Sequence, residues 1–102
     1  MEWYQYIAAF FSGVLFANVV PHFVHGISGN KFPTPFSHPS GVGLSSSTTN
    51  VVWALFNLLV GYLLSTVSKL DKAHPLSMVV FFAGIAAISI FSSIRFRGKH
   101  VE

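Results

Sequence analysis

Three histidines after the first apolar stretch are the residues of this sequence best suited to chemistry. His22 and His25 are three residues apart, so they would share one side of a continuing helical turn. Such a pair can bind one metal ion, and His38 could supply the third ligand of a zinc or copper site. No carboxylate or cysteine accompanies them. The competing interpretation is structural, because the half-apolar imidazole ring suits a membrane boundary with its polar tip in water.

Two asparagines within apolar stretches form the second candidate site. Asn18 lies near the end of the first stretch and Asn57 in the middle of the second. An unpaired amide in hydrocarbon costs several kcal/mol, so each side chain should face a polar group. At helical spacing, one narrow face collects Asn50, Ala54, Asn57, Gly61, Ser65 and Ser68. This face either packs against a neighbouring helix or lines the path of a small transport or pore element.

Catalytic residues are not expected. The three acids are Glu2, Asp71 and Glu102, and the chain has no cysteine, so general acid–base and thiol chemistry lack their usual groups. The segment 26–29 (Gly-Ile-Ser-Gly) resembles the G-x-S-G around the nucleophile of rhomboid-type intramembrane proteases, which pair that serine with a histidine on another helix. No histidine lies within a later apolar stretch of this chain. We therefore expect a protein that is not an enzyme and has no cofactor apart from the metal considered above.

The composition indicates an integral membrane protein. Of 102 residues, 52% are hydrophobic and 9% are charged, and the mean hydropathy is +0.61. A soluble domain typically carries about 25% charged residues. The low charge excludes an ordinary water-exposed surface, and we expect one all-α membrane domain over residues 1–102.

Three stretches have the length and composition of transmembrane helices, at about residues 3–24, 50–68 and 75–95. At 1.5 Å per residue each approaches the roughly 30 Å of a hydrocarbon core. Pro21 cannot donate a hydrogen bond to the carbonyl of Ala17, so the first helix either stops near Val20 or kinks and continues to about Val24. Serine and threonine hydroxyls at 45–49 offer caps for the second helix, and Pro75 suits the first turn of the third.

Small residues on each helix predict close helix packing. In lipid, helices associate through close backbone approach and hydrogen bonds. Gly13 lies between Ala9 and Ala17 at four-residue spacing, Gly61 belongs to the asparagine face, and Gly84 accompanies a pair of alanines on the third helix, Ala83 and Ala87. We expect Gly13, Gly61 and Gly84, with Asn18 and Asn57, to form the polar and small interior of the bundle.

The segment 25–49 is predicted to be an ordered loop. It is longer than a simple helix connection and has Lys31 as its only full charge. Its prolines prevent a long helix, its glycines permit tight turns, and its apolar residues distinguish it from a disordered linker. We expect the loop from about residue 22 to 49 to cap one end of the bundle and to serve as a recognition surface.

The residues 96–102 form a basic tail that suits anionic lipid headgroups better than nucleic acid. Arg95, Arg97 and Lys99 follow an apolar run directly. With three spans, these residues and Lys31 share one side, whereas Lys69 and Lys72 share the other. This asymmetry favours a cytoplasmic C-terminus and an N-terminus outside.

The leading functional hypothesis is association. A small multi-pass protein of this kind would act in the lipid bilayer as an accessory subunit or a self-assembling oligomer, binding itself or another membrane subunit through the loop. The alternatives are a metal or small-ligand protein using His22, His25 and His38, and a transport or pore element lined by the Asn57 face.

Overall fold

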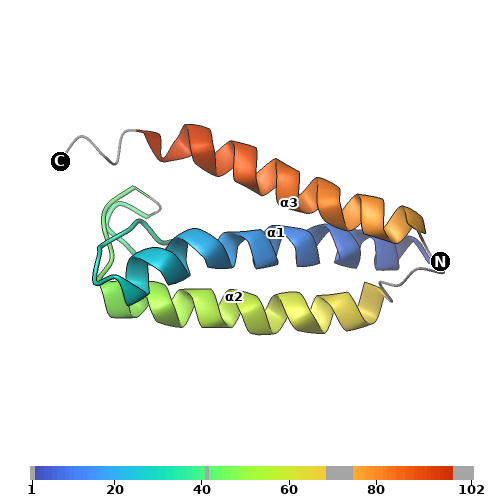
Figure 1. The fold of residues 1–102 in the computed structure, drawn as a ribbon, viewed down its shortest axis with the longest axis horizontal. Coiled ribbons are helices and arrows are strands. Elements are labelled where there is room, and N and C mark those ends of the chain that lie inside the picture. The colour runs from blue at the N-terminus through green and yellow to red at the C-terminus, as the bar shows by residue number, and fades with distance from the viewer. Residues whose placement is uncertain (1, 41, 69–74, 98–102) are drawn as a thin grey trace.

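The computed structural model describes residues 2–40, 42–68 and 75–97, and three helices account for most of them (Figure 1). These are α1 (Trp3–Ile27), α2 (Ser47–Ser68) and α3 (Pro75–Arg95). Each is long and apolar enough to cross a membrane. The described residues contain no strand beyond an isolated bridge between Phe32 and Ser45. The prediction of an all-α protein with three candidate membrane helices is confirmed.

The helix starts follow local capping chemistry. The hydroxyl of Ser46 accepts a hydrogen bond from the backbone N–H of Thr49 at 3.1 Å, which satisfies one of the unpaired donors of the first turn of α2. As a result α2 begins at Ser47, three residues before the predicted start. Pro75 opens α3, where its missing N–H costs no helical hydrogen bond.

Helix α1 continues through Pro21 and ends at Ile27. The alternative that it stops near Val20 is wrong, and the helix exceeds the predicted end at 24 by three residues. Tertiary contacts supply the reason. His22, one residue after the proline, is buried and bonded to α2, and Gly26 lies against the backbone of α2 at Ser47 and Val51. These contacts outweigh the one helical hydrogen bond that Pro21 removes.

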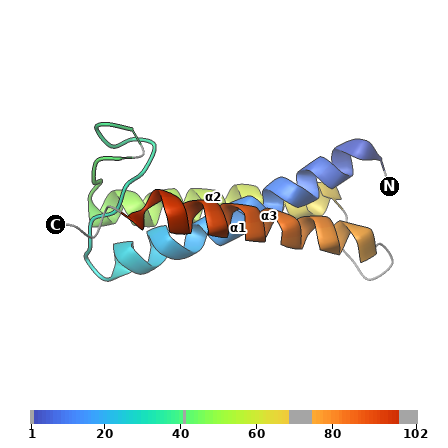
Figure 2. The ribbon, with the colours of Figure 1, turned by 90° about the horizontal axis from the view of Figure 1, so that it is seen from above.

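Helix α1 is the centre of the arrangement. Both α2 and α3 pack against it, and the chain runs along the molecule, back and along again (Figures 1 and 2). The C-terminal ends of α1 and α3, the start of α2 and the loop therefore gather at one end, which we call the loop end. Lys31, Arg95 and Arg97 belong to this end, as the sequence predicted.

Burial in this fold is inverted relative to a soluble protein. Asn50, Ala54, Asn57, Gly61 and Ser68 are the buried residues of α2, whereas Phe56 and four of its five leucines are exposed. Five of the six residues of the predicted polar and small face are thus buried, and Ser65 is the exception. Such an exterior suits lipid, and the interior supplies the hydrogen bonds that hydrocarbon cannot.

Helices α1 and α3 meet through two glycines. A Cβ placed on Gly13 would overlap the carbonyl oxygen of Phe81, and a Cβ on Gly84 would overlap that of Phe10. Each glycine therefore lets the backbone of the other helix approach to a distance that no side chain permits. Ala83 and Ala87 are exposed, so their expected contribution to packing within the bundle is not found.

Candidate functional site

Side-chain hydrogen bonds join α1 and α2 along most of their length. Gln5 donates to the carbonyl of Val67 at 3.4 Å, and Ser12 donates to the carbonyl of Gly61 at 2.8 Å. Nearer the loop end, Asn18 donates to the amide oxygen of Asn57 at 3.2 Å, and the Nδ1 atom of His22 lies 2.7 Å from the amide oxygen of Asn50. Because the bonds are distributed along the contact, α1 and α2 are fixed in register.

Asn50 is the hydrogen-bond centre of the loop end. Its buried amide nitrogen points at the backbone carbonyls of Phe32 (3.0 Å), Ser46 (3.0 Å) and Ser45 (3.3 Å). All three partners accept, so this atom is the donor and the amide oxygen must accept from His22. The Nδ1 atom of His22 therefore carries a proton. One side chain thus connects α1, α2 and both sides of the loop.

The loop is stabilised by its own polar groups. Phe32 and Ser45 exchange backbone hydrogen bonds of 3.3 and 3.0 Å. The hydroxyls of Thr34 and Ser45 lie 2.6 Å apart, and Ser37 donates to the carbonyl of Thr34 at 2.7 Å. The buried ring of Phe32 stacks on His25, with centroids 4.5 Å apart. These contacts produce the ordered cap that the sequence predicted.

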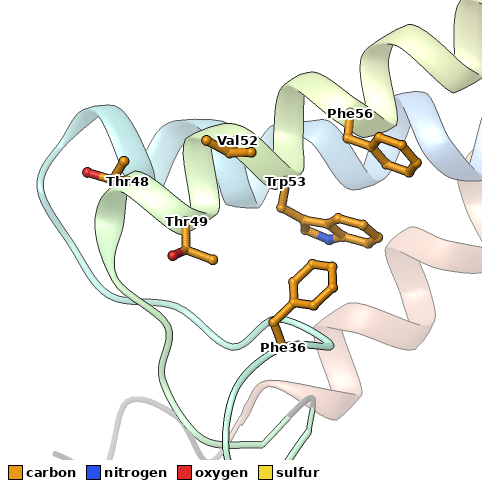
Figure 3. A pocket seen from close by; sticks show the side chains of 6 residues that line it. All are labelled: Phe36, Thr48, Thr49, Val52, Trp53 and Phe56. Carbon is orange, nitrogen blue, oxygen red and sulfur yellow. The ribbon is translucent and has the colours of Figure 1, made fainter.

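An aromatic groove lies on the outside of this cap, where the loop meets α2 (Figure 3). Its volume is about 380 Å³, and its lining consists of Phe36, Thr48, Thr49, Val52, Trp53 and Phe56. The ring of Phe36 meets Trp53 at 87°, and Trp53 stacks on Phe56 at 15°, with centroids 5.1 and 5.7 Å apart. Phe36 and Phe56 remain 62% and 55% exposed. The loop therefore leaves the ring of Phe36 exposed.

The histidines have structural contacts. His22 bonds to Asn50, and His25 stacks on Phe32. His38 is exposed. Among residues 2–40, 42–68 and 75–97, no group of three or more histidine, cysteine or acidic side chains is placed to bind a metal ion, so His22, His25 and His38 are not brought together as one.

The Asn57 face is buried in the contact between α1 and α2. Asn57 is 1% exposed, accepts from Asn18 and donates to the carbonyl of Trp53 at 2.7 Å. Gly61 lies against Leu15 and Phe16 of α1. This geometry matches the packing interpretation of the face, because its polar atoms are paired within the protein.

The basic residues of the tail are only partly described. Arg95 ends α3, and Arg97 follows it; both are exposed at the loop end. Lys99, the third predicted headgroup contact, lies outside the described residues.

Comparison with known proteins gives no relative: no family model matches this chain, and no curated protein or solved structure matches it.

Several contacts of the loop end were not predicted from the sequence. The polar face included Asn50 as a packing residue, but its role in holding the loop depends on Phe32 and Ser45, which are distant in sequence. Gly26 was not recognised as a contact with α2. The groove was not predicted because no regular spacing in the sequence relates Phe36 of the loop to Trp53 of α2. The only local pattern that pointed to this end of the protein was the run of serine and threonine hydroxyls at 45–49, which was interpreted as caps for the helix that contains Asn50.

Proposed function

We propose that this protein acts by association within the membrane, with the aromatic groove as the surface that binds a partner. The observation that carries this proposal is Phe36, an exposed aromatic ring on a loop that is fixed by internal hydrogen bonds. Aromatic side chains, phenylalanine included, are enriched in protein interfaces. Fixing such a ring before binding reduces the entropy lost on association.

The proposed occupant is an apolar segment of a membrane protein, either another subunit or a second copy of this chain. The groove lies beside the start of α2, which is a candidate membrane span, so its partner must be compatible with the membrane boundary. Hydroxyls of Thr48 and Thr49 at the rim can pair with polar groups of that partner. A three-helix protein also encloses little interior, which favours function through a complex.

The groove is tested by Phe36→Ala with Phe82→Ala as the matched control. Both rings are exposed, but Phe82 lies on α3 away from the groove. Since an aromatic anchor contributes about 2 kcal/mol or more, Phe36→Ala should weaken retention of the partner at least about tenfold. Pull-down in mild detergent with quantitative mass spectrometry measures this ratio. Equal retention by the two variants contradicts the proposal, as does an unchanged oligomer with no retained partner in any preparation.

We also propose that the loop end faces the cytoplasm and the N-terminus lies outside. The charges of Lys31, Arg95 and Arg97 at one end support this orientation. Because the chain has no cysteine, single cysteines can be placed freely, for example Ser40→Cys in the loop. A membrane-impermeant thiol reagent should leave this cysteine unlabelled in intact cells and label it after lysis. Labelling in intact cells would reverse the orientation.

A further inference from the structure

The loop shows the same inverted burial as the helices. Three hydroxyl side chains are buried in it, those of Thr34, Ser37 and Ser45. Three large apolar side chains are exposed on it, those of Phe36, Val42 and Leu44. A loop in water has the opposite arrangement, because apolar side chains turn inwards and hydroxyls remain outside. The outer surface of this loop therefore matches an apolar surrounding.

The loop lies beside the helices and not beyond their ends. Figures 1 and 2 both place it at the level of the last turn of α1 and the first turns of α2, and Figure 2 shows it on one side of the helix layer. The ring of Phe36 contacts Trp53, with centroids 5.1 Å apart. Since Trp53 is six residues after Ser47, the first residue of α2, this contact is about 9 Å from the helix end.

This position is at the depth of lipid. Helix α2 has 22 residues, so it is about 33 Å long, close to the roughly 30 Å of a hydrocarbon core. With α2 across the bilayer, Phe36 therefore reaches the outer part of the hydrocarbon. Val52 and Phe56 of α2, which line the aromatic groove with Phe36, are also exposed. The apolar exterior of the loop thus continues the apolar exterior of the helix.

The loop backbone suits the boundary of the bilayer. A backbone N–H group without a partner cannot enter hydrocarbon. Six described residues between 32 and 45 donate theirs within the protein, namely Phe32, Phe36, Ser37, Val42, Gly43 and Ser45. The prolines of this segment have no N–H to donate. The few remaining N–H groups need water or headgroups, so the loop fits the boundary and not the centre of the bilayer.

The charges at this end suit the surface of a leaflet. Lys31 is the only full charge of the loop, and it is exposed. Arg97 is exposed at the same end. Glu2 is the only carboxylate in the described part of the chain, and it lies at the opposite end of the molecule. Basic residues beside a span, with no acid nearby, are attracted to anionic headgroups.

We propose that the loop is an interfacial anchor, whose outer surface inserts into the leaflet at the loop end. Its apolar side chains lie where headgroups meet acyl chains, the position that the apolar face of an interfacial helix occupies. Those side chains are Phe36, Val42 and Leu44. The exposed polar residues of the loop lie among the headgroups, namely Lys31, His38 and Ser40.

The leaflet is the occupant that the position itself supplies, because lipid surrounds the exposed side of a spanning helix at this level. The inference does not rest on the proposed association. Val42 and Leu44 do not line the aromatic groove, so these two residues test the anchor separately from the groove.

Spin labels measure the depth of the loop directly. Because the chain has no cysteine, Val42→Cys and Leu44→Cys can each be labelled with a nitroxide in vesicles of phosphatidylcholine and phosphatidylglycerol. Power saturation compares collisions with oxygen, which concentrates in hydrocarbon, and with a neutral nickel chelate, which stays in water. Leu59→Cys, at an exposed position in the middle of α2, is the lipid reference. Asn30→Cys, at an exposed polar position of the loop, is the water reference.

We expect the oxygen-to-nickel collision ratio at Val42 and Leu44 to be at least about threefold higher than at Asn30 and to approach that at Leu59. A ratio equal to that at Asn30 would place the surface in water and overturn the anchor. Few collisions with either reagent would mean that protein covers this surface, from a second copy or another subunit, and would overturn it as well.

A second pair of variants tests whether these side chains hold the loop in lipid. Val42→Asp, with the label at Leu44→Cys, adds a charge that hydrocarbon and anionic headgroups both disfavour. We expect the collision ratio to fall at least about twofold, whereas the isosteric and neutral Val42→Thr should change it less. An unchanged ratio in Val42→Asp would mean that lipid does not hold the loop and would overturn the anchor. Circular dichroism checks the fold of each variant.

Discussion

The two helix contacts of this protein differ in how they are made. Helix α1 meets α2 through side-chain hydrogen bonds at four levels, from Gln5 to His22. It meets α3 through a crossing of two glycines, Gly13 and Gly84, beyond which the helices diverge around a hollow. The first contact is distributed along the helices, whereas the second is concentrated at one crossing.

This difference shows how a small membrane protein can have a rigid part and, beside it, a space between helices. In lipid the hydrophobic effect does not drive helices together, so rigidity must come from polar pairs or very close packing. The distributed bonds fix α1, α2 and the loop as one unit, and this unit presents the aromatic groove. The glycine crossing attaches α3 and leaves a hollow between α1 and α3 beside it.

The largest effect is expected from Gly84→Leu, which breaks the α1–α3 contact at its crossing. The new side chain would occupy the position of the carbonyl of Phe10, and a backbone cannot yield as a flexible side chain does. We expect a loss of more than about 3 kcal/mol of stability, because overpacking already costs 1–3 kcal/mol where side chains can adjust. Unfolding in mixed micelles with increasing dodecyl sulfate measures the loss. The control is Ala83→Leu, at an exposed position next to Gly84. Equal stability of the two variants would contradict the close contact of α1 and α3 at Gly84.

A smaller effect is expected from Asn50→Leu, which tests the α1–α2 contact where it holds the loop. The change leaves the proton on Nδ1 of His22 without its partner, and it removes one of the two hydrogen bonds that the carbonyl of Phe32 accepts. Since a buried polar group without a partner costs about 1–3 kcal/mol, we expect the loop to open and become sensitive to protease. Cleavage is followed by mass spectrometry, with the exposed Asn30→Leu as control. Unchanged resistance in Asn50→Leu would mean that the loop is held mainly by its own bonds.

The smallest effect is expected from Ser12→Ala, which removes one bond from the distributed contact. The hydroxyl donates to the carbonyl of Gly61, and such bonds between membrane helices average about 0.6 kcal/mol. The loss should be of this size in the same unfolding assay, and Ser93→Ala, which removes a hydroxyl bonded within α3, should lose less. A loss as large as that of Gly84→Leu would show that the α1–α2 contact also depends on a single position.

The elements of the fold were predictable because their signals are local. Apolar runs of about 20 residues are the length that a bilayer requires, and helical spacing identified the buried face of α2. The end of α1 was not predictable in this way. Pro21 is a local signal for termination, and it is overridden by the contacts of His22 and Gly26 with α2, which no local pattern contains.

The sequence by itself determined the membrane character, the number of candidate spans, the polar face of α2 and the presence of an ordered loop. These depend on composition and periodicity, which act within one element. Only the tertiary structure decided that Asn50 holds the loop, that Phe36 remains exposed beside Trp53, and that Ser92 and Arg95 border a hollow next to Asn18. The reason is physical: each of these joins side chains from different elements, and no local pattern in the sequence determines how those elements meet.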